Sequence, residues 1–154
     1  MHFTLELEAN CYPNILRAEL SRRETAEEMQ EFITALNAEI RKSGCKLILI
    51  RVRHSRPLFS AEQYAGLTRL AATPDIRIAL VAHTQELRAS HHYVELLTRQ
   101  HGANVRGFND EASAREWLKS AAAPVPALDS RHREELERAH RALRRKVTEG
   151  EDAD

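Results

Sequence analysis

The chain opens with alternating apolar and polar residues. Phe3, Leu5 and Leu7 alternate with polar positions, which is the period of a strand with one buried face. Residues 10–14 contain turn-forming Asn and Pro, and residues 15–20 predict a return strand. The chain is therefore expected to begin with an antiparallel hairpin.

The next segment has the periodicity of an amphipathic helix. Thr25 and Glu28 have the spacing of a capping box, which marks a helix start. Gly44 is the usual type of residue just beyond a helix end. Between them, apolar residues recur on one helical face: Met29, Phe32, Ile33, Leu36 and Ile40. The pattern predicts a helix that ends before Gly44.

Short apolar runs then predict further strands. Residues 46–52 and 76–82 are almost continuously apolar, which is typical of strands covered on both faces. Residues 103–108 predict a shorter last strand.

Helix-capping residues stand between and after these runs. Ser60 and Gln63 form a second capping box. Thr84 is expected to cap a longer helix, and Asn109 or Asp110 to cap the next one. The predicted order is β-β-α-β-α-β-α-β-α, an α/β fold with a mixed, mostly parallel sheet.

The end of the chain predicts an additional helix. Residues 1–120 form the α/β domain, and residues 121–129 are a Pro-containing linker. Residues 130–148 predict an amphipathic helix, followed by a tail at 149–154. The apolar stripe of such a helix must be covered, either by its own domain or by a second copy of the chain.

Charge and composition exclude several classes of protein. The 154 residues contain 23 Lys and Arg against 23 Asp and Glu, so net charge gives no reason to expect a nucleic-acid partner. No apolar run approaches the about 18 residues of a membrane span, and the start has no basic and apolar leader. We therefore expect a cytoplasmic protein without an integral membrane segment. Cys11 and Cys45 are not in a CxxC pair and are expected to be reduced.

The candidate site lies where the parallel strands end, because ligands of open α/β sheets bind outside the carboxyl ends of strands. Basic groups near helix N-termini there would suit a phosphate or carboxylate, although solvated loop charges are the alternative. The candidate ligand-binding residues are Arg53, His54, Ser55, Arg56, His83 and Thr84. The sequence lacks the residue spacings of a glycine-rich nucleotide loop, of a zinc site and of a catalytic triad. We therefore expect no catalytic residue, metal or cofactor.

Three stretches resemble a known family. Residues 46–52, 76–82 and 103–117, the last reading ANVRGFNDEASAREW, are similar to the SpoIIAA-like branch of the STAS domains of small bacterial proteins. The resemblance implies a non-enzymatic regulatory or protein-interaction module, with a protein partner or self-association. STAS domains also resemble the lipid-binding CRAL-TRIO core. The alternative is therefore a carrier of a small anionic or lipidic ligand at the strand ends.

The resemblance also raises a phosphorylation hypothesis. Anti-sigma-factor antagonists of this family carry an Asp-Ser-Ser-Gly turn whose serine is phosphorylated. That string is missing here, and Ser60 stands at about its place. Ser60 is thus a candidate phosphoacceptor, with the simpler interpretation that it caps a helix because Gln63 completes the box.

Overall fold

The computed structural model confirms the predicted order of elements. It describes residues 1–8, 13–58, 60, 62–100, 102–120, 138–139 and 141–142. The elements are β1 (His2–Glu8), β2 (Ile15–Ser21), α1 (Ala26–Ser43), β3 (Leu47–Arg53), α2 (Ala65–Ala71), β4 (Arg77–Val81), α3 (Gln85–Arg99), β5 (Asn104–Phe108) and α4 (Glu111–Lys119).

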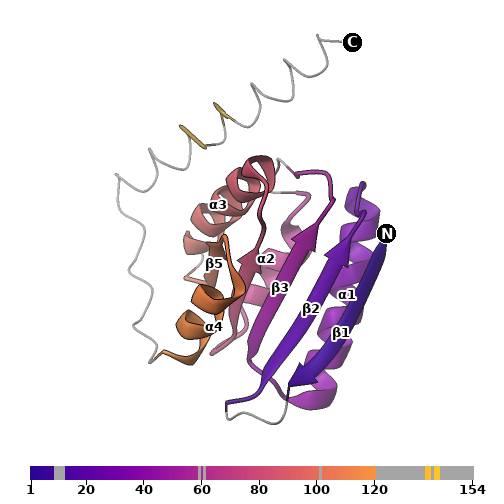
Figure 1. Cartoon of the computed structure of the whole chain (residues 1–154), viewed down its shortest axis with the longest axis vertical. Coiled ribbons are helices and arrows are strands. Elements are labelled where there is room, and N and C mark those ends of the chain that lie inside the picture. Colours follow the sequence, from indigo (N-terminus) through magenta and orange to yellow (C-terminus); the bar gives the residue numbers. More distant parts are fainter. Residues whose placement is uncertain are drawn as a thin grey trace.

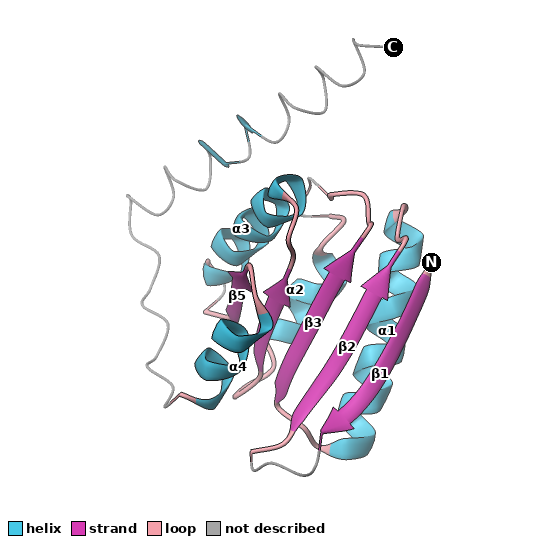
Figure 2. Cartoon of the chain, viewed as in Figure 1, coloured by secondary structure: helices cyan, strands magenta, loops and turns pink. Residues whose placement is uncertain are grey.

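One mixed sheet organises the domain, with strand order β1-β2-β3-β4-β5 (Figure 1). β1 pairs with β2 in antiparallel fashion, and the other neighbours are parallel. Successive parallel strands are joined by crossovers of one hand, which puts their connecting helices on the same face. α1, α2 and α3 cover that face, and α4 lies on the opposite one (Figure 2).

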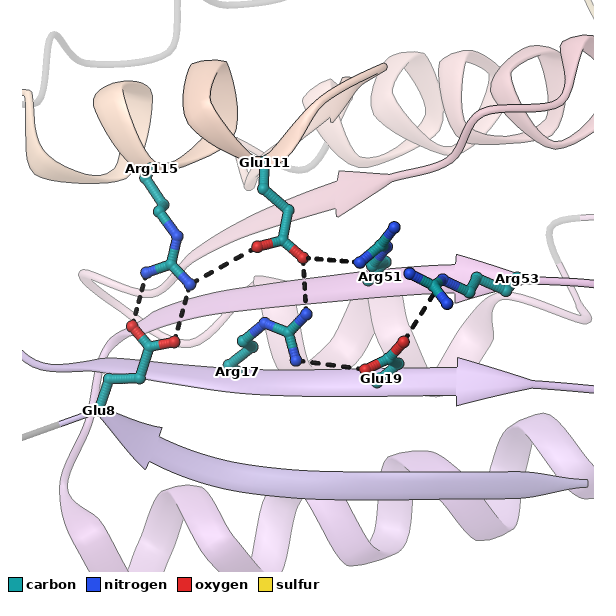
Figure 3. Close-up of polar contacts among 7 residues, drawn as sticks. All are labelled: Glu8, Arg17, Glu19, Arg51, Arg53, Glu111 and Arg115. Atoms are coloured by element: carbon teal, nitrogen blue, oxygen red, sulfur yellow. Dashed lines mark hydrogen bonds and ion pairs between the residues drawn. The ribbon is translucent and has the colours of Figure 1, made fainter.

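The two sheet faces have cores of different size. The larger core joins the three-helix face of the sheet to α1, α2 and α3, and includes Phe32, Ile50 and Ile78. The smaller core contains Ala79, Val81, Ala114 and Leu118, where α4 packs on the sheet. α4 makes its closest contacts with β3, β4 and β5. We call the side of the sheet that carries α4 the open face, because over β1 and β2 it bears charged side chains (Figure 3).

The ends of α1 are formed as the sequence predicts. The Glu28 amide donates to Thr25 Oγ1 at 3.1 Å, and the Thr25 amide donates to Glu28 Oε1 at 3.2 Å. Gly44 ends the helix with φ of 70°, a left-handed conformation that favours glycine. Cys45 follows as a buried free thiol, while Cys11 lies outside the described residues.

Replacing Thr25 by Ala should lower the free energy of unfolding by about 1 kcal/mol, because the first turn of α1 loses its cap. Thr34→Ala is the matched control on the same helix. It removes only an exposed hydroxyl bonded to the Gln30 carbonyl, and should change stability by less than about 0.5 kcal/mol. Urea unfolding of both variants measures the difference, and equal losses would contradict a capping role for Thr25.

α2 begins later than the sequence predicts. The capping-box bonds between Ser60 and Gln63 do form, at 3.1 and 3.2 Å, but the helix starts at Ala65. Tyr64, just before it, has φ of −99° and ψ of 6°, outside helical geometry. Its ring is buried and its hydroxyl is hydrogen-bonded to Ser90 of α3. This tertiary contact accounts for the delayed start.

The predicted linker at 121–129 and tail at 149–154 lie outside the described residues. Within the predicted helix at 130–148, the four described residues are helical. One of them, Ala139, is partly buried against the larger core.

Candidate functional site

Two loops meet at the carboxyl end of the sheet, where β2 and β3 end. Ser21 and Arg53 are the last paired residues of these parallel strands. The chain segments that follow, residues 22–25 and 54–58, therefore start side by side. We call them the strand-end loops.

Hydrogen bonds join the strand-end loops to each other. The Arg22 amide donates to the Arg53 carbonyl at 3.3 Å, and the Arg56 amide donates to the Arg23 carbonyl at 2.8 Å. The Arg23 amide donates to Ser55 Oγ at 3.2 Å, and that hydroxyl donates to the Arg53 carbonyl at 3.0 Å. The two loops consequently form one unit.

Arg23 is buried between these loops, with 2% of its surface exposed. Its guanidinium donates to the Arg56 carbonyl and, at 3.6 Å, to Met29 Sδ, while Nε has no partner. Among the described residues, no carboxylate forms an ion pair with it. Burial lowers the pKa of Arg23, with smaller opposing effects of Tyr64 and Glu28. The loops are thus held by a buried positive charge that, within the described residues, forms no ion pair, an arrangement that costs free energy.

The backbone of both loops is strained at facing positions. Arg22 has φ of 57° and His54 has φ of 46°. This left-handed conformation costs a non-glycine residue roughly 1–2 kcal/mol. Asp75 also has a positive φ, of 70°. Asp and His adopt that region more readily than other side chains, so the strain is greatest at Arg22. Strain of this kind gathers at functional sites, where surrounding contacts hold it in place.

Four of the six predicted ligand-binding residues are consecutive in the sequence and share one strand end. Arg53, His54, Ser55 and Arg56 lie in or beside the strand-end loops. His54 and Arg56 are exposed, whereas Ser55 is engaged in the hydrogen bonds between the loops. The guanidinium of Arg53 pairs with Glu19 of β2 at 3.4 Å.

His83 and Thr84 lie beyond the end of β4. Thr84 Oγ1 accepts from the Leu87 amide at 3.3 Å and caps α3, as predicted. Hydrogen bonds from Ser113 lower the pKa of Asp110, and the nearby His83 adds to this effect. In the described part of the chain, no hydrogen bond or ion pair joins His83 or Thr84 to the strand-end loops.

Ser60 lies after the second strand-end loop and is partly buried. Its hydroxyl accepts from the Gln63 amide and its own amide donates to the Gln63 side chain. Phosphorylation of Ser60 stays a prediction.

A network of charged side chains crosses the open face (Figure 3). Glu111 of α4 lies at its centre, 2.7 Å from Arg17, 3.5 Å from Arg51 and 3.6 Å from Arg115. Burial raises the pKa of Glu111, but the hydrogen bond from Arg17 and the three positive charges outweigh it and lower the pKa. The network therefore ties α4 electrostatically to β2 and β3.

The other charges of this network are paired as well. Arg115 holds both carboxylate oxygens of Glu8 in β1, and this hydrogen bonding lowers the pKa of Glu8. Glu19 accepts from Arg17 at 3.3 Å and forms an ion pair with Arg53 at 3.4 Å. The arginines of this network are thus compensated by neighbouring carboxylates. The alternation of charged residues in β2 and β3 is the sequence signal for this face, but the pairing with α4 was not predicted.

The described residues offer neither a metal site nor a membrane-spanning helix. No group of three or more His, Cys, Asp or Glu side chains is placed to hold a metal ion there. In the same part of the chain, no helix combines the length and apolarity needed to cross a membrane.

Comparison with known proteins supports the resemblance seen in the sequence. No curated protein matches the chain in sequence. One solved structure that it resembles is an uncharacterised protein with a SpoIIAA-like fold from Shewanella loihica. The two share 14% identity with a TM-score of 0.47, over 75% of this chain and 93% of that one. A family model described as SpoIIAA-like matches residues 15–119. The chain belongs to the SpoIIAA-like family.

Proposed function

We propose that this protein is a non-enzymatic interaction module that docks an acidic segment of a protein partner on its strand-end loops. One observation carries the proposal: Arg22 and His54 are held in left-handed conformations at facing positions of the two loops that bury Arg23. A fold that only needed to close these turns would favour glycine at such positions. The strain is instead retained at residues that present basic side chains to solvent.

The charge of the loops supports an acidic partner. Arg22 and Arg56 are exposed and, among the described residues, form no ion pair. Arg17, Arg51, Arg53 and Arg115, the arginines drawn in Figure 3, by contrast, all pair with carboxylates. Glu24 is the exposed carboxylate next to Arg22, so the two unpaired arginines outnumber it. Positive charge that is left uncompensated at a surface attracts and orients an acidic partner.

The serines near the loops fit an interaction site better than a catalytic one. Ser55 donates to a backbone carbonyl and accepts from a backbone amide. Ser60 likewise accepts from a backbone amide. A nucleophilic serine needs a neighbouring base to take its proton, and the hydrogen bonds of both hydroxyls are instead with backbone groups.

The test compares two charge reversals of equal size. Arg22→Glu with Arg56→Glu reverses the strand-end loops, and Lys42→Glu with Arg69→Glu reverses exposed cations on α1 and α2. Partners are first captured from the native cell extract and identified. Each partner is then purified, and its affinity is measured for the wild type, the loop variant and the control variant. We expect a protein partner whose affinity falls about tenfold or more with the loop variant only. Equal affinities for the loop variant and the control would overturn the proposal.

A small anionic or lipidic ligand at the same loops is the second candidate function. The observation in its favour is the buried guanidinium of Arg23 without a carboxylate. Native mass spectrometry of the whole chain separates the candidates. A retained small mass that the loop variant loses would favour the ligand. A dimer that the loop variant dissociates would identify the partner as a second copy.

A further inference from the structure

A cleft of about 580 Å³ lies away from the strand-end loops, between α3 and the end of β5. Its size is within the range of small-molecule sites. Residues of α3 form one wall, and the end of β5 with the first turn of α4 forms the other. The cleft is lined by Gln85, Arg88, Ala89, His91, His92, Glu95, Gly107, Phe108, Asn109 and Ser113.

Gly107 keeps the cleft open. Its φ is not in the left-handed region, which among the described glycines is occupied by Gly44 and Gly102. A Cβ at position 107 would lie 3.4 Å from His91 Cβ and 3.8 Å from Glu95 Oε2. Glycine weakens a strand interior and often marks a place where another group approaches closely. A longer side chain at position 107 would extend into the space that the cleft occupies.

The charges at the cleft favour an anion. Glu95 is already engaged, since its carboxylate accepts from the Gly107 amide at 3.1 Å and pairs with Arg99 at 3.2 Å. Arg88 is exposed on the wall and forms no ion pair within the described residues. A guanidinium in this position can bind a carboxylate through two parallel hydrogen bonds.

A buried imidazole forms part of the same wall. His91 is 3% exposed and lines the cleft, and its Nδ1 has no hydrogen-bond partner. Burial, with a smaller contribution from Arg23, lowers the pKa of His91 to about 3. The imidazole is therefore neutral near pH 7, and it leaves Arg88 as the unpaired charge on this wall.

We propose that this cleft binds a small organic carboxylate, whose oxygens pair with Arg88 and whose apolar body lies against Ala89 and Phe108. The apolar contact follows from the lining, because Phe108 is partly exposed beside Ala89 in an otherwise polar cleft. The amides of Gln85 and Asn109 are further hydrogen-bond donors on its walls.

The proposal is tested with benzoate as the probe, by NMR titration of the ¹⁵N-labelled full chain at constant ionic strength. We expect saturable shifts that include the amides of Gly107, Phe108 and Asn109. Arg88→Ala should weaken binding about tenfold, and Arg69→Ala on α2, the matched control, should leave it unchanged. Gly107→Val should abolish the saturable shifts while the remaining spectrum stays folded.

Three outcomes would overturn the proposal. The first is chemical-shift changes that increase linearly with benzoate concentration without saturation. The second is equal affinity of the Arg88→Ala variant and the wild type for benzoate. The third is binding of inorganic phosphate in the cleft without binding of benzoate. The last outcome would mean an oxyanion site that makes no use of the apolar wall. Each result is independent of the strand-end loops, so failure here would not affect the proposed docking function.

Discussion

Acidification below pH 6.5 should destabilise the fold through His91 by about 1.4 kcal/mol for each pH unit. Burial, with a smaller contribution from Arg23, lowers the pKa of His91 from 6.5 to about 3. In the unfolded chain the imidazole takes up a proton below pH 6.5, whereas in the folded protein it stays neutral. The unfolded state then binds more protons, so the free energy of unfolding falls as pH decreases from 6.5 toward 3.

The measurement is urea unfolding at several pH values between about 7.5 and 5 for the wild type, His91→Gln and His92→Gln. The carboxyls of Glu8, Glu28 and Glu111, whose pKa values are lowered in the folded protein, take up protons in the unfolded chain near their ordinary pKa of 4.5, so they contribute at the lower end of this window and equally in all three proteins. We expect the wild type to lose stability along this slope, and His92→Gln is the control for loss of an imidazole on the same helix. His91→Gln should have a flatter slope, whatever its stability at pH 7.5. Equal slopes for all three proteins would contradict a neutral buried His91.

The elements that the sequence predicts well are those whose signals are local. A capping box and a C-terminal glycine bracket α1 within a single segment, and both form as predicted. The apolar runs at 46–52 and 76–82 predict β3 and β4 because both strands are covered on two faces and need no alternation. Such patterns depend on a few neighbouring residues, so an isolated sequence can reveal them.

The interior polar residues could not be predicted in this way. Ser90 and His91 look like surface residues of α3, yet both are buried. Ser90 donates to the Leu58 carbonyl and is hydrogen-bonded to Tyr64. These partners are 32 and 26 residues away in the chain. Only the packing of α2 and α3 determines whether such a side chain faces solvent or the core.

The candidate site has the same division between local and tertiary information. Ligands of open α/β sheets bind at the carboxyl ends of parallel strands, and those ends can be located from the sequence. This is how the sequence indicates Arg53, His54, Ser55 and Arg56. The role of Arg23 depends on how two loops cross, and a pair of arginines after a strand does not indicate which one is buried. The contact between Glu8 and Arg115, 107 residues apart, is likewise determined by the docking of α4.

Replacing Arg77 by Met should lower the free energy of unfolding by about 2–3 kcal/mol, because the last carbonyls of α4 lose their donor. Arg77 lies at the start of β4 and is 8% exposed. Its Nη1 donates to the carbonyls of Trp117, Leu118 and Ser120 at 3.0, 3.2 and 2.6 Å. The guanidinium also lies 5.8 Å from the centre of the Trp117 ring. Methionine preserves much of the apolar part of the Arg77 side chain. The loss of stability therefore measures mainly the contribution of the positively charged guanidinium.

Arg106→Met is the control for this substitution. Arg106 is exposed on β5, and its guanidinium contacts the Phe108 ring at 5.6 Å. Replacing Arg106 by Met should lower the free energy of unfolding by less than about 1 kcal/mol. Hydrogen exchange then locates the effect of Arg77→Met, since the amides of α4 should lose protection before those of β3 and β4. Because Glu111 and Arg115 reach the open face from α4, a loosened helix would also disrupt the network around Arg17. If stability fell while α4 kept its protection, Arg77 would act through the sheet rather than through the helix end.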